Sequence, residues 1–331
     1  MLARRWTWVL PASPEPRVER DVAYWTVPGT DRKLLADIWQ PPEGVQPSGL
    51  AFIHLHGGGH ASFDKGLPPN EPWFRHLAAQ GHVVMDVAYR LVPETNVPGM
   101  QGDVKRAIVW MKRNAAALGV NPDRVVLGGD SAGAHLALLA AYAPDDPLLT
   151  PEDVRGEDLS VRGVVNYYAV ADYRLESRPL VERGPVAETA KRLLTSLMET
   201  WSGARVPPDD EWSAQFTGGQ REDWPELYRR VSPITHVGPD APPTLQFVGE
   251  HDVYVSRGGS ILALHRRLQA AGVPSVYVEL PQTDHAFDML LPELSPAAQA
   301  AMYDVDRFLA LMASGWERPV SAPPEGAQAA R

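Results

Sequence analysis

Short, almost unbroken apolar runs alternate along the chain with longer stretches in which apolar residues recur at helical spacing. In one such stretch Val104, Ile108 and Met111 fall on one face of a helix, and Gly119 follows its end. Strands that alternate with helices of roughly 10–20 residues are typical of βαβ units and of a parallel sheet with right-handed crossovers. The pattern predicts strands at 50–55, 83–88, 125–127, 161–168, 244–248 and 275–280, of which 50–55 and 125–127 are expected to be buried, and helices over 71–80, 101–118, 132–142, 261–271 and 297–312.

The two ends of this pattern differ from its middle. Residues 18–27 and 34–39 predict the two strands of an antiparallel hairpin, because a Pro-Gly turn signal separates them. Ahead of it we expect an N-terminal arm over 1–17. Residues 314–331 are rich in Pro, Ala and Gly and predict a flexible tail. The last strand, at 275–280, would lie at an edge of the sheet, which fits either a monomer or a homodimer paired along it.

One segment interrupts the alternation, at residues 172–231. Roughly sixty residues is too long for an ordinary connection between elements. Loops of this length in compact domains are often lids or binding elements, so we expect an inserted helical lid; the alternative is an extra packing element. The α/β core is then expected over 18–171 and 232–313. The large apolar side chains of the insertion include Leu193, Leu194, Leu197, Met198, Trp201, Trp212, Trp224 and Tyr228.

Composition and charge narrow the class of protein. Apolar residues make up 44% of the 331 residues, which is enough for a large core and argues against disorder. The formal net charge of −10 argues against a nucleic-acid-binding protein, which would carry a basic patch. No apolar run approaches the roughly 18 residues that a membrane-spanning helix needs. The chain contains no cysteine, which excludes disulfide scaffolds, cysteine-ligated metal centres and thiol catalysis.

The N-terminal residues do not resemble a signal peptide. Arg4 and Arg5 come early, but Pro11, Pro14 and Pro16 cut the apolar run that follows them. A signal peptide needs an uninterrupted apolar stretch of roughly 7–15 residues. We therefore expect a cytoplasmic protein; a secreted or N-terminally trimmed form is the alternative.

The turn Gly129-Asp130-Ser131-Ala132-Gly133 carries the first candidate for chemistry. It fits the pattern G-x-S-x-G and lies between a predicted buried strand and a predicted apolar helix. In that setting a serine is held on a strained elbow with its hydroxyl exposed, and small flanking residues let the strand and helix backbones approach closely. The alternative is a glycine-rich turn whose serine caps the helix. The context favours Ser131 as a nucleophile.

Three glycines follow the first buried strand, in His56-Gly57-Gly58-Gly59. Glycine allows positive φ and close approach of backbone N–H groups to a ligand, so such a loop can donate hydrogen bonds to an oxyanion. A nucleotide-phosphate loop is the alternative, but the run lacks the GxxxxGK[ST] and GxGxxG patterns. The amide of Ala132, directly after the nucleophile, would complete an oxyanion hole.

A nucleophilic serine needs a base, and the base needs a group that orients it. In a fold of this type the expected chain order is Ser, then Asp or Glu, then His. Two predicted strands downstream of Ser131 run into Gly249-Glu250-His251-Asp252 and Asp284-His285. The carboxyl ends of parallel strands meet at one edge of the sheet, where ligand sites lie. We therefore predict Asp252 as the acid and His285 as the base; the competitors are Glu250, Asp288, His251, His236 and His265.

The chain also resembles a known group of enzymes. His56-Gly-Gly-Gly59 and Gly129-Asp-Ser-Ala-Gly133 look like the motifs of hormone-sensitive-lipase-like (bacterial family IV) carboxylesterases, which belong to the α/β-hydrolase superfamily. Tyr89-Arg-Leu-Val-Pro-Glu94 is similar to that family's Tyr-Arg-Leu-Ala-Pro-Glu. The related feruloyl-esterase and formamidase-like hydrolases are resembled by Leu35-Ala-Asp-Ile-Trp39, Ser232-Pro-Ile-Thr235 and Asp284-His-Ala-Phe287. The resemblance spans residues 18–312.

The resemblance implies an α/β-hydrolase fold with a mostly parallel sheet and an activity as a serine carboxylesterase. No metal or organic cofactor is expected for that chemistry. An amidase, formamidase or peptidase that uses the same residues is the alternative, and a non-catalytic ligand receptor is a remote one. The implied roles are nucleophile for Ser131, orienting acid for Asp252, base for His285, and oxyanion-hole donors for the amides of Gly58, Gly59 and Ala132.

The chain departs from the resembled family at three positions near the site. His60 stands where an aromatic residue commonly follows the glycines, Ala134 where many members have glycine, and Ala286 where glycine often follows the histidine. We expect His60, Trp201 and Leu197 to line the substrate pocket. A pocket covered by the insertion would limit chain length, so the predicted small-molecule substrates are short- to medium-chain esters.

Overall fold

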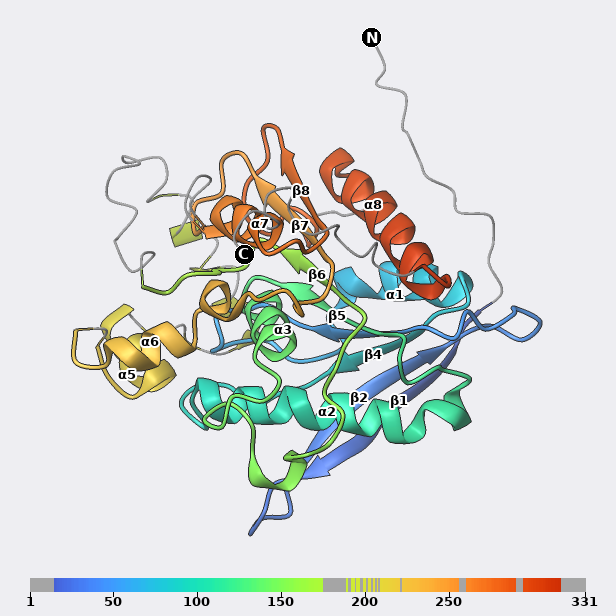
Figure 1. Cartoon of the computed structure of the whole chain (residues 1–331), viewed down its shortest axis with the longest axis horizontal. Coiled ribbons are helices and arrows are strands. Elements are labelled where there is room, and N and C mark those ends of the chain that lie inside the picture. Colours follow the sequence, from blue (N-terminus) through green and yellow to red (C-terminus); the bar gives the residue numbers. More distant parts are fainter. Residues whose placement is uncertain are drawn as a thin grey trace, which may run out of the picture.

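The computed structural model contains one eight-stranded sheet with helices on both of its faces (Figure 1). No helix in the described part of the chain is long and apolar enough to cross a membrane. The structure describes residues 15–174, 209–220, 222–255, 260–289 and 294–316, together with 189, 192–193, 195–196, 199–200, 202–203, 205 and 207.

The strands lie across the sheet in the order β1-β2-β4-β3-β5-β6-β7-β8. β1 pairs antiparallel with β2, and β2 with β4, whereas every other neighbouring pair is parallel. β3 to β7 are buried along their whole length, which explains why they form mostly apolar runs in the sequence. The strands are β1 Arg17–Thr26, β2 Lys33–Gln40, β3 Ala51–Leu55, β4 Val83–Val87, β5 Val125–Asp130, β6 Gly163–Tyr167, β7 Thr244–Gly249 and β8 Ser275–Leu280.

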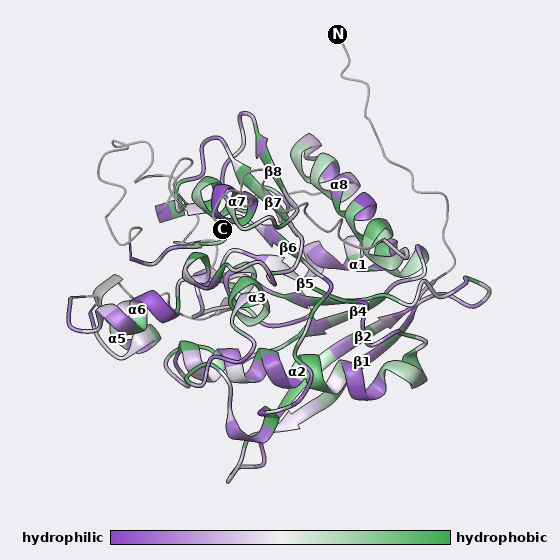
Figure 2. Cartoon of the chain, in the orientation of Figure 1, coloured by the Kyte–Doolittle hydropathy of each residue, from purple (hydrophilic) through white to green (hydrophobic). Residues whose placement is uncertain are grey.

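Helices form a layer on each face of the sheet. α1 and α8 share one apolar core through Phe74 and Val305, and α2, α3 and α7 share the other through Ile108, Leu136 and Leu264. Figure 2 shows both hydrophobic and hydrophilic residues along α2 and α8, whereas α3 is buried throughout and mostly hydrophobic. The helices are α1 Glu71–Ala79, α2 Val97–Leu118, α3 Ala132–Tyr142, α5 Asp209–Thr217, α6 Pro225–Arg230, α7 Ser260–Ala270 and α8 Pro296–Ala313, with 3₁₀ turns at Pro68–Asn70, Glu152–Val154 and Pro233–His236.

Two elements are longer than the sequence predicts. α2 begins at Val97 rather than at 101, because the Asn96 side chain accepts a hydrogen bond from the Gly99 amide at 3.2 Å and Pro98 is tolerated in a first turn. β5 continues to Asp130 because its last residues still pair with β6. The other predicted strands and helices agree with the structure to within two residues.

The segment 172–231 contains helix in its described part, including α5 and α6. Phe216 of α5 is fully buried, and its ring lies 4.6 Å from the ring of His60. This contact anchors the insertion to the loop that follows β3. The role of the insertion as a lid, and the domain boundaries drawn around it, stay predictions. Leu194, Leu197, Met198, Trp201 and the side chain of Trp212 lie outside the described residues.

Candidate active site

Ser131 lies on a sharp turn between β5, which ends at Asp130, and α3, which begins at Ala132. Its φ of 51° and ψ of −112° are strained for a residue with a side chain. Two hydrogen bonds hold the turn: the Ser131 amide donates to the Tyr167 carbonyl at 2.8 Å, and the Ser131 carbonyl accepts from the His135 amide at 3.0 Å. A strained strand–turn–helix elbow of this kind presents a serine hydroxyl at the sheet edge.

Gly129 and Gly133 make the elbow sterically possible. A Cβ atom at Gly133 would lie 1.9 Å from the Leu55 carbonyl oxygen, and one at Gly129 would lie 2.2 Å from the same oxygen. Both distances are far inside van der Waals contact. The absence of these two side chains therefore lets the nucleophile turn pack directly on the end of β3.

Ser131, His285 and Asp252 form one chain of hydrogen bonds. The Ser131 hydroxyl lies 3.0 Å from His285 Nε2, and His285 Nδ1 lies 2.9 Å from Asp252 Oδ2. A carboxylate only accepts, so Nδ1 carries the imidazole proton and Nε2 is free to accept the serine proton. The second oxygen of Asp252 accepts from the amides of Tyr254 at 2.9 Å and Val255 at 2.7 Å. These bonds fix the carboxylate in place.

The surroundings of His285 favour its charged form. Burial by itself lowers the pKa of His285, but the Asp252 carboxylate, reinforced by Asp288 and Asp284, more than offsets this and raises the pKa above its ordinary value. The rings of Tyr168 and Tyr254 lie 4.4 Å and 4.9 Å from the imidazole. An imidazolium formed during proton transfer would therefore be stabilised at this position.

The other candidate carboxylates point elsewhere. Asp288 accepts a hydrogen bond from the Tyr168 hydroxyl, and burial, followed by the charge of Asp130, raises the pKa of Asp288 to about 7. Glu250 accepts from the Gln282 amide at 3.0 Å. The structure therefore places Asp252, rather than Asp288 or Glu250, on the imidazole.

The other candidate histidines are held by different groups. His236 Nε2 donates to the Arg230 carbonyl at 2.7 Å, and His265 Nδ1 lies 3.0 Å from the Ser275 hydroxyl. His251 is exposed at the surface. Of the predicted bases, His285 is the one that the structure brings to Ser131.

The glycine run forms a tight turn beside the elbow. Gly58 and Gly59 have φ values of 107° and 61°, and a Cβ atom at Gly58 would lie 2.2 Å from the Ser62 carbonyl oxygen. A Cβ atom at Gly133, in the first turn of α3, would lie 2.5 Å from the His56 carbonyl, so the turn and the helix N-terminus are in direct contact. The first amides of a helix have no intrahelical acceptor, and together with a glycine turn they can bind an anionic oxygen.

A family model described as BD-FAE matches residues 36–268, which include the glycine run, the elbow and Asp252. The chain belongs to the BD-FAE family. The α/β-hydrolase fold predicted from the sequence is confirmed by this match and by the eight-stranded sheet. The resemblance drawn from the two glycine motifs is confirmed as well.

Two relatives of this BD-FAE chain carry names that describe ester hydrolysis. The probable carboxylic ester hydrolase LipM of Mycobacterium tuberculosis is 31% identical over 283 residues, which cover 83% of this chain. The ethyl acetate hydrolase of Pseudomonas putida is 28% identical over 279 residues, 82% of this chain and 76% of its own length. The BD-FAE chain spans 57% of the length of LipM.

Two solved structures of one esterase are similar in fold to the BD-FAE chain. The apo form of Thermogutta terrifontis esterase 2 has a TM-score of 0.68 at 23% identity, covering 94% of this chain and 98% of that one. The propionate-bound form of the same esterase has a TM-score of 0.65 at 22% identity, with the same coverage. These similarities show the shared fold.

His60, one of the predicted pocket residues, is buried and belongs to a pair of histidines. The His135 Nε2 atom donates to the Val231 carbonyl at 2.8 Å, so His135 Nδ1 accepts from His60 Nε2 at 3.1 Å. Burial lowers the pKa of His60 well below its ordinary value and that of His135 to about 4. Both rings are neutral near pH 7. Trp201 and Leu197, the other predicted pocket residues, lie outside the described residues.

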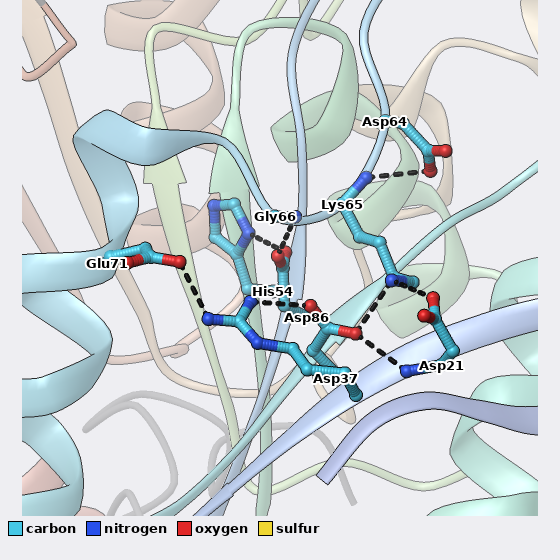
Figure 3. A network of polar contacts seen from close by, with 9 residues as sticks. Asp21, Asp37, His54, Asp64, Lys65, Gly66, Glu71 and Asp86 are labelled. Atoms are coloured by element: carbon cyan, nitrogen blue, oxygen red, sulfur yellow. Dashed lines mark hydrogen bonds and ion pairs between the residues drawn. The ribbon is translucent and has the colours of Figure 1, made fainter. Parts of the chain in front are cut away.

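Sequence reasoning missed a polar cluster beneath the glycine turn. His54, in the buried strand β3, lies between the carboxylates of Asp86 and Asp130 (Figure 3 shows the Asp86 side). A histidine in the middle of an apolar strand was the available signal, because a buried polar group requires a partner. In the described part of the chain, no group of three or more His, Asp or Glu side chains could hold a metal ion.

Proposed function

We propose that this chain is a serine carboxylesterase with Ser131 as nucleophile, His285 as general base and Asp252 as orienting acid. One observation carries the proposal: a continuous hydrogen-bond chain from Asp252 through His285 ends on a serine held at a strained elbow. The names of LipM and the ethyl acetate hydrolase support an ester as the substrate.

In the acylation step, Ser131 Oγ attacks the ester carbonyl while His285 Nε2 takes the hydroxyl proton. The negative charge moves to the carbonyl oxygen, and the amides of Gly58, Gly59 and Ala132 are the proposed donors to it. His285 then protonates the leaving alcohol as the C–O bond breaks, which leaves an acyl-serine. The charge of Asp252 stabilises the imidazolium, and its contact with Nδ1 holds the neutral imidazole in the tautomer that leaves Nε2 without a proton.

Deacylation repeats these steps with water as the nucleophile. His285 takes a proton from water as the hydroxyl attacks the acyl-serine, and it returns that proton to Ser131 Oγ as the carboxylic acid leaves. Protons and electrons balance without any further reagent.

We propose esters with short to medium acyl chains as the preferred substrates. The insertion 172–231 is the proposed cover of the pocket, and Phe216 anchors it on His60 beside the glycine turn. The name of the ethyl acetate hydrolase and the propionate bound to the Thermogutta esterase fit a small acyl group. Alanine substitutions across 193–224 should then change the ratio of kcat/KM for short and long esters.

An ester panel combined with active-site labelling tests this function. Wild-type protein should hydrolyse ethyl acetate and ethyl butyrate, prefer them to long-chain triglycerides, and react with a fluorophosphonate probe at Ser131. The Ser131→Ala variant should lose both properties by several orders of magnitude, because nucleophile and base act as one unit. Absence of turnover and of labelling in folded wild-type protein would exclude a serine esterase. Faster hydrolysis of a matched anilide than of the ester would make the chain an amidase.

A further inference from the structure

His54 is buried at the centre of the sheet with a carboxylate on each ring nitrogen. Nδ1 lies 2.9 Å from Asp86 Oδ1, and Nε2 lies 3.3 Å from Asp130 Oδ1. Its side chain and those of both aspartates are at most 4% exposed. A carboxylate only accepts, so both ring nitrogens donate only when the imidazole is protonated. Burial lowers the pKa of His54, but the two carboxylates overcome this effect and raise it to about 9.

The same two carboxylates also hold the loop that contains the glycine turn. Asp130 Oδ2 accepts from the Gly57 amide at 2.9 Å, and Asp86 Oδ2 accepts from the Gly66 amide at 2.6 Å. Figure 3 shows Asp86 between the His54 ring and Gly66. Gly57 and Gly66 are the two ends of this loop. Each end is thus bonded to a carboxylate whose other oxygen faces His54.

We propose that the His54 cation is a positioning residue for the oxyanion loop, which it holds at both ends through Asp86 and Asp130. The inference rests on the proposed esterase function, because it assigns His54 a part in forming the oxyanion hole. His54 does not touch the reacting atoms. It acts through Asp130, which precedes Ser131, and through the backbone amides of the loop.

The charge of His54 matters for two physical reasons. A neutral imidazole has one N–H group, so it can donate to only one of the two carboxylates, and one loop end loses its charge-assisted support. Loss of the proton also leaves two uncompensated buried carboxylates beside the elbow. Their field opposes the negative charge that develops on the substrate oxygen in the transition state, whereas a neutral bound ester feels little of it. The effect therefore falls on kcat rather than on KM.

The charged group that lies closest to the His54 cluster in the neighbouring strand has cationic partners of its own. Asp37 lies beside Asp86 in the neighbouring strand, and it pairs with Lys65 and Arg20, each at 2.7 Å. Helix α1 contributes the aromatic rings of Trp73 and Phe74, whose centroids lie 5.7 Å and 4.9 Å from the His54 ring. The other titratable groups that interact electrostatically with Asp86 or Asp130 include His56 and Asp288, together with the buried tyrosines Tyr89, Tyr167 and Tyr168. Burial raises the pKa of each tyrosine well above its ordinary value, so these hydroxyls stay neutral through about pH 9.

The wild-type pH profile gives the first test. Hydrolysis of ethyl butyrate is followed by base uptake at constant pH between about pH 6 and pH 10, with the fold monitored by circular dichroism. We expect kcat to fall by roughly tenfold or more on an alkaline limb near pH 9, with KM changed by less than about twofold. A kcat that stays level to about pH 10 in folded protein overturns the inference.

The His54→Gln variant gives the second test, with His76→Gln as its matched control. His76 is another buried histidine paired with a carboxylate, since its Nε2 lies 2.7 Å from Asp306 Oδ2, but that pair joins α1 to α8. We expect His54→Gln to lose roughly 10- to 100-fold in kcat at pH 7 and to lack the alkaline limb. The control should keep the wild-type kcat and limb. Equal kcat losses in the two variants would mean a general stability effect and contradict the proposal.

If His54→Gln does not fold, the Asp86→Asn variant tests the same inference. It removes one of the two carboxylates that hold the proton, so the alkaline limb should move to lower pH. An unchanged limb contradicts the inference. Failure of the two proposals is distinguishable, because wild-type protein without ester turnover refutes the esterase, whereas active wild-type protein whose limb does not depend on His54 refutes only the positioning role.

Discussion

The Asp252→Asn variant tests most directly whether the carboxylate sets the tautomer of His285. One oxygen of this carboxylate already accepts hydrogen bonds from the backbone, which restricts how an asparagine can be placed. Asp252 Oδ1 accepts from two backbone amides, those of Tyr254 and Val255, and Oδ2 faces His285 Nδ1 at 2.9 Å. An asparagine keeps the two backbone bonds only if its oxygen takes the Oδ1 position. Its NH₂ group then points at the imidazole.

An NH₂ group can only donate, so it selects the tautomer of His285 whose proton sits on Nε2. The nitrogen that lies 3.0 Å from Ser131 Oγ would then carry a hydrogen and could not accept the serine proton. The equivalent change in serine proteases costs about 10⁴ in kcat, or about 5 kcal/mol in the activation free energy. We expect a loss of roughly 10³- to 10⁴-fold here, because the two amides restrict reorientation of the side chain.

The assay measures kcat and KM for ethyl butyrate, together with the rate of fluorophosphonate labelling of Ser131. Asp288→Asn and Glu250→Gln are the controls, because both carboxylates have partners other than the imidazole. Each control should stay within about tenfold of wild type. A folded Asp252→Asn protein that keeps more than about a tenth of wild-type kcat would refute the reasoning. A larger loss of kcat in either control than in Asp252→Asn would refute it as well.

Three further predictions concern the acid limb of the pH profile, the anchoring of α5 by Phe216, and the effect of Asp288 on stability. Neutral His285 is the proposed base and its pKa is raised, so kcat/KM should fall in acid with a midpoint above about 6.5, and a profile flat to about pH 5 argues against a histidine base. Phe216→Ala should lower the free energy of unfolding in urea by roughly 3–5 kcal/mol, whereas a loss below about 1 kcal/mol would mean that α5 is not anchored through this ring. Burial raises the pKa of Asp288 to about 7, so its stabilising contribution is complete below about pH 4 and is lost as the pH rises through 7. Asp288→Asn should therefore gain stability relative to wild type between about pH 5 and pH 8, and parallel urea titrations with no such gain would contradict the assignment.

Strands and helices could be predicted from the sequence where a run of apolar residues corresponds to an element that is buried on all sides. β3 to β7 form mostly apolar runs because both of their faces are covered, and α3 could be placed at 132–142 because nearly all of its residues are apolar. The start of α2 was missed for a local reason. Pro98 and Gly99 usually interrupt helices, and here the side chain of Asn96 caps the first turn that contains them.

The candidate site also contains residues that could be predicted from the sequence and residues that could not. Ser131 and His285 could be predicted from motifs and chain order, but the choice among Glu250, Asp252 and Asp288 depends on how two loops fold around the imidazole. The His54 cluster could not be predicted, because its carboxylates come from neighbouring strands and Asp86 lies 32 positions away in sequence. Pairing of this kind follows from the strand order, which the sequence pattern does not contain.

The strand order also determines where a ligand can bind. β3 and β5 are neighbours, yet the chain leaving β3 continues into α1 on one face of the sheet, and the chain leaving β5 continues into α3 on the other (Figure 1). Such a place, where two connections diverge to opposite faces, is a topological switch point, and ligands of open α/β sheets generally bind there, outside the carboxyl ends of the strands. The glycine turn follows the end of β3, and Ser131 follows the end of β5. A change in the insertion 172–231 would leave these two segments side by side, because the winding of the core places them there.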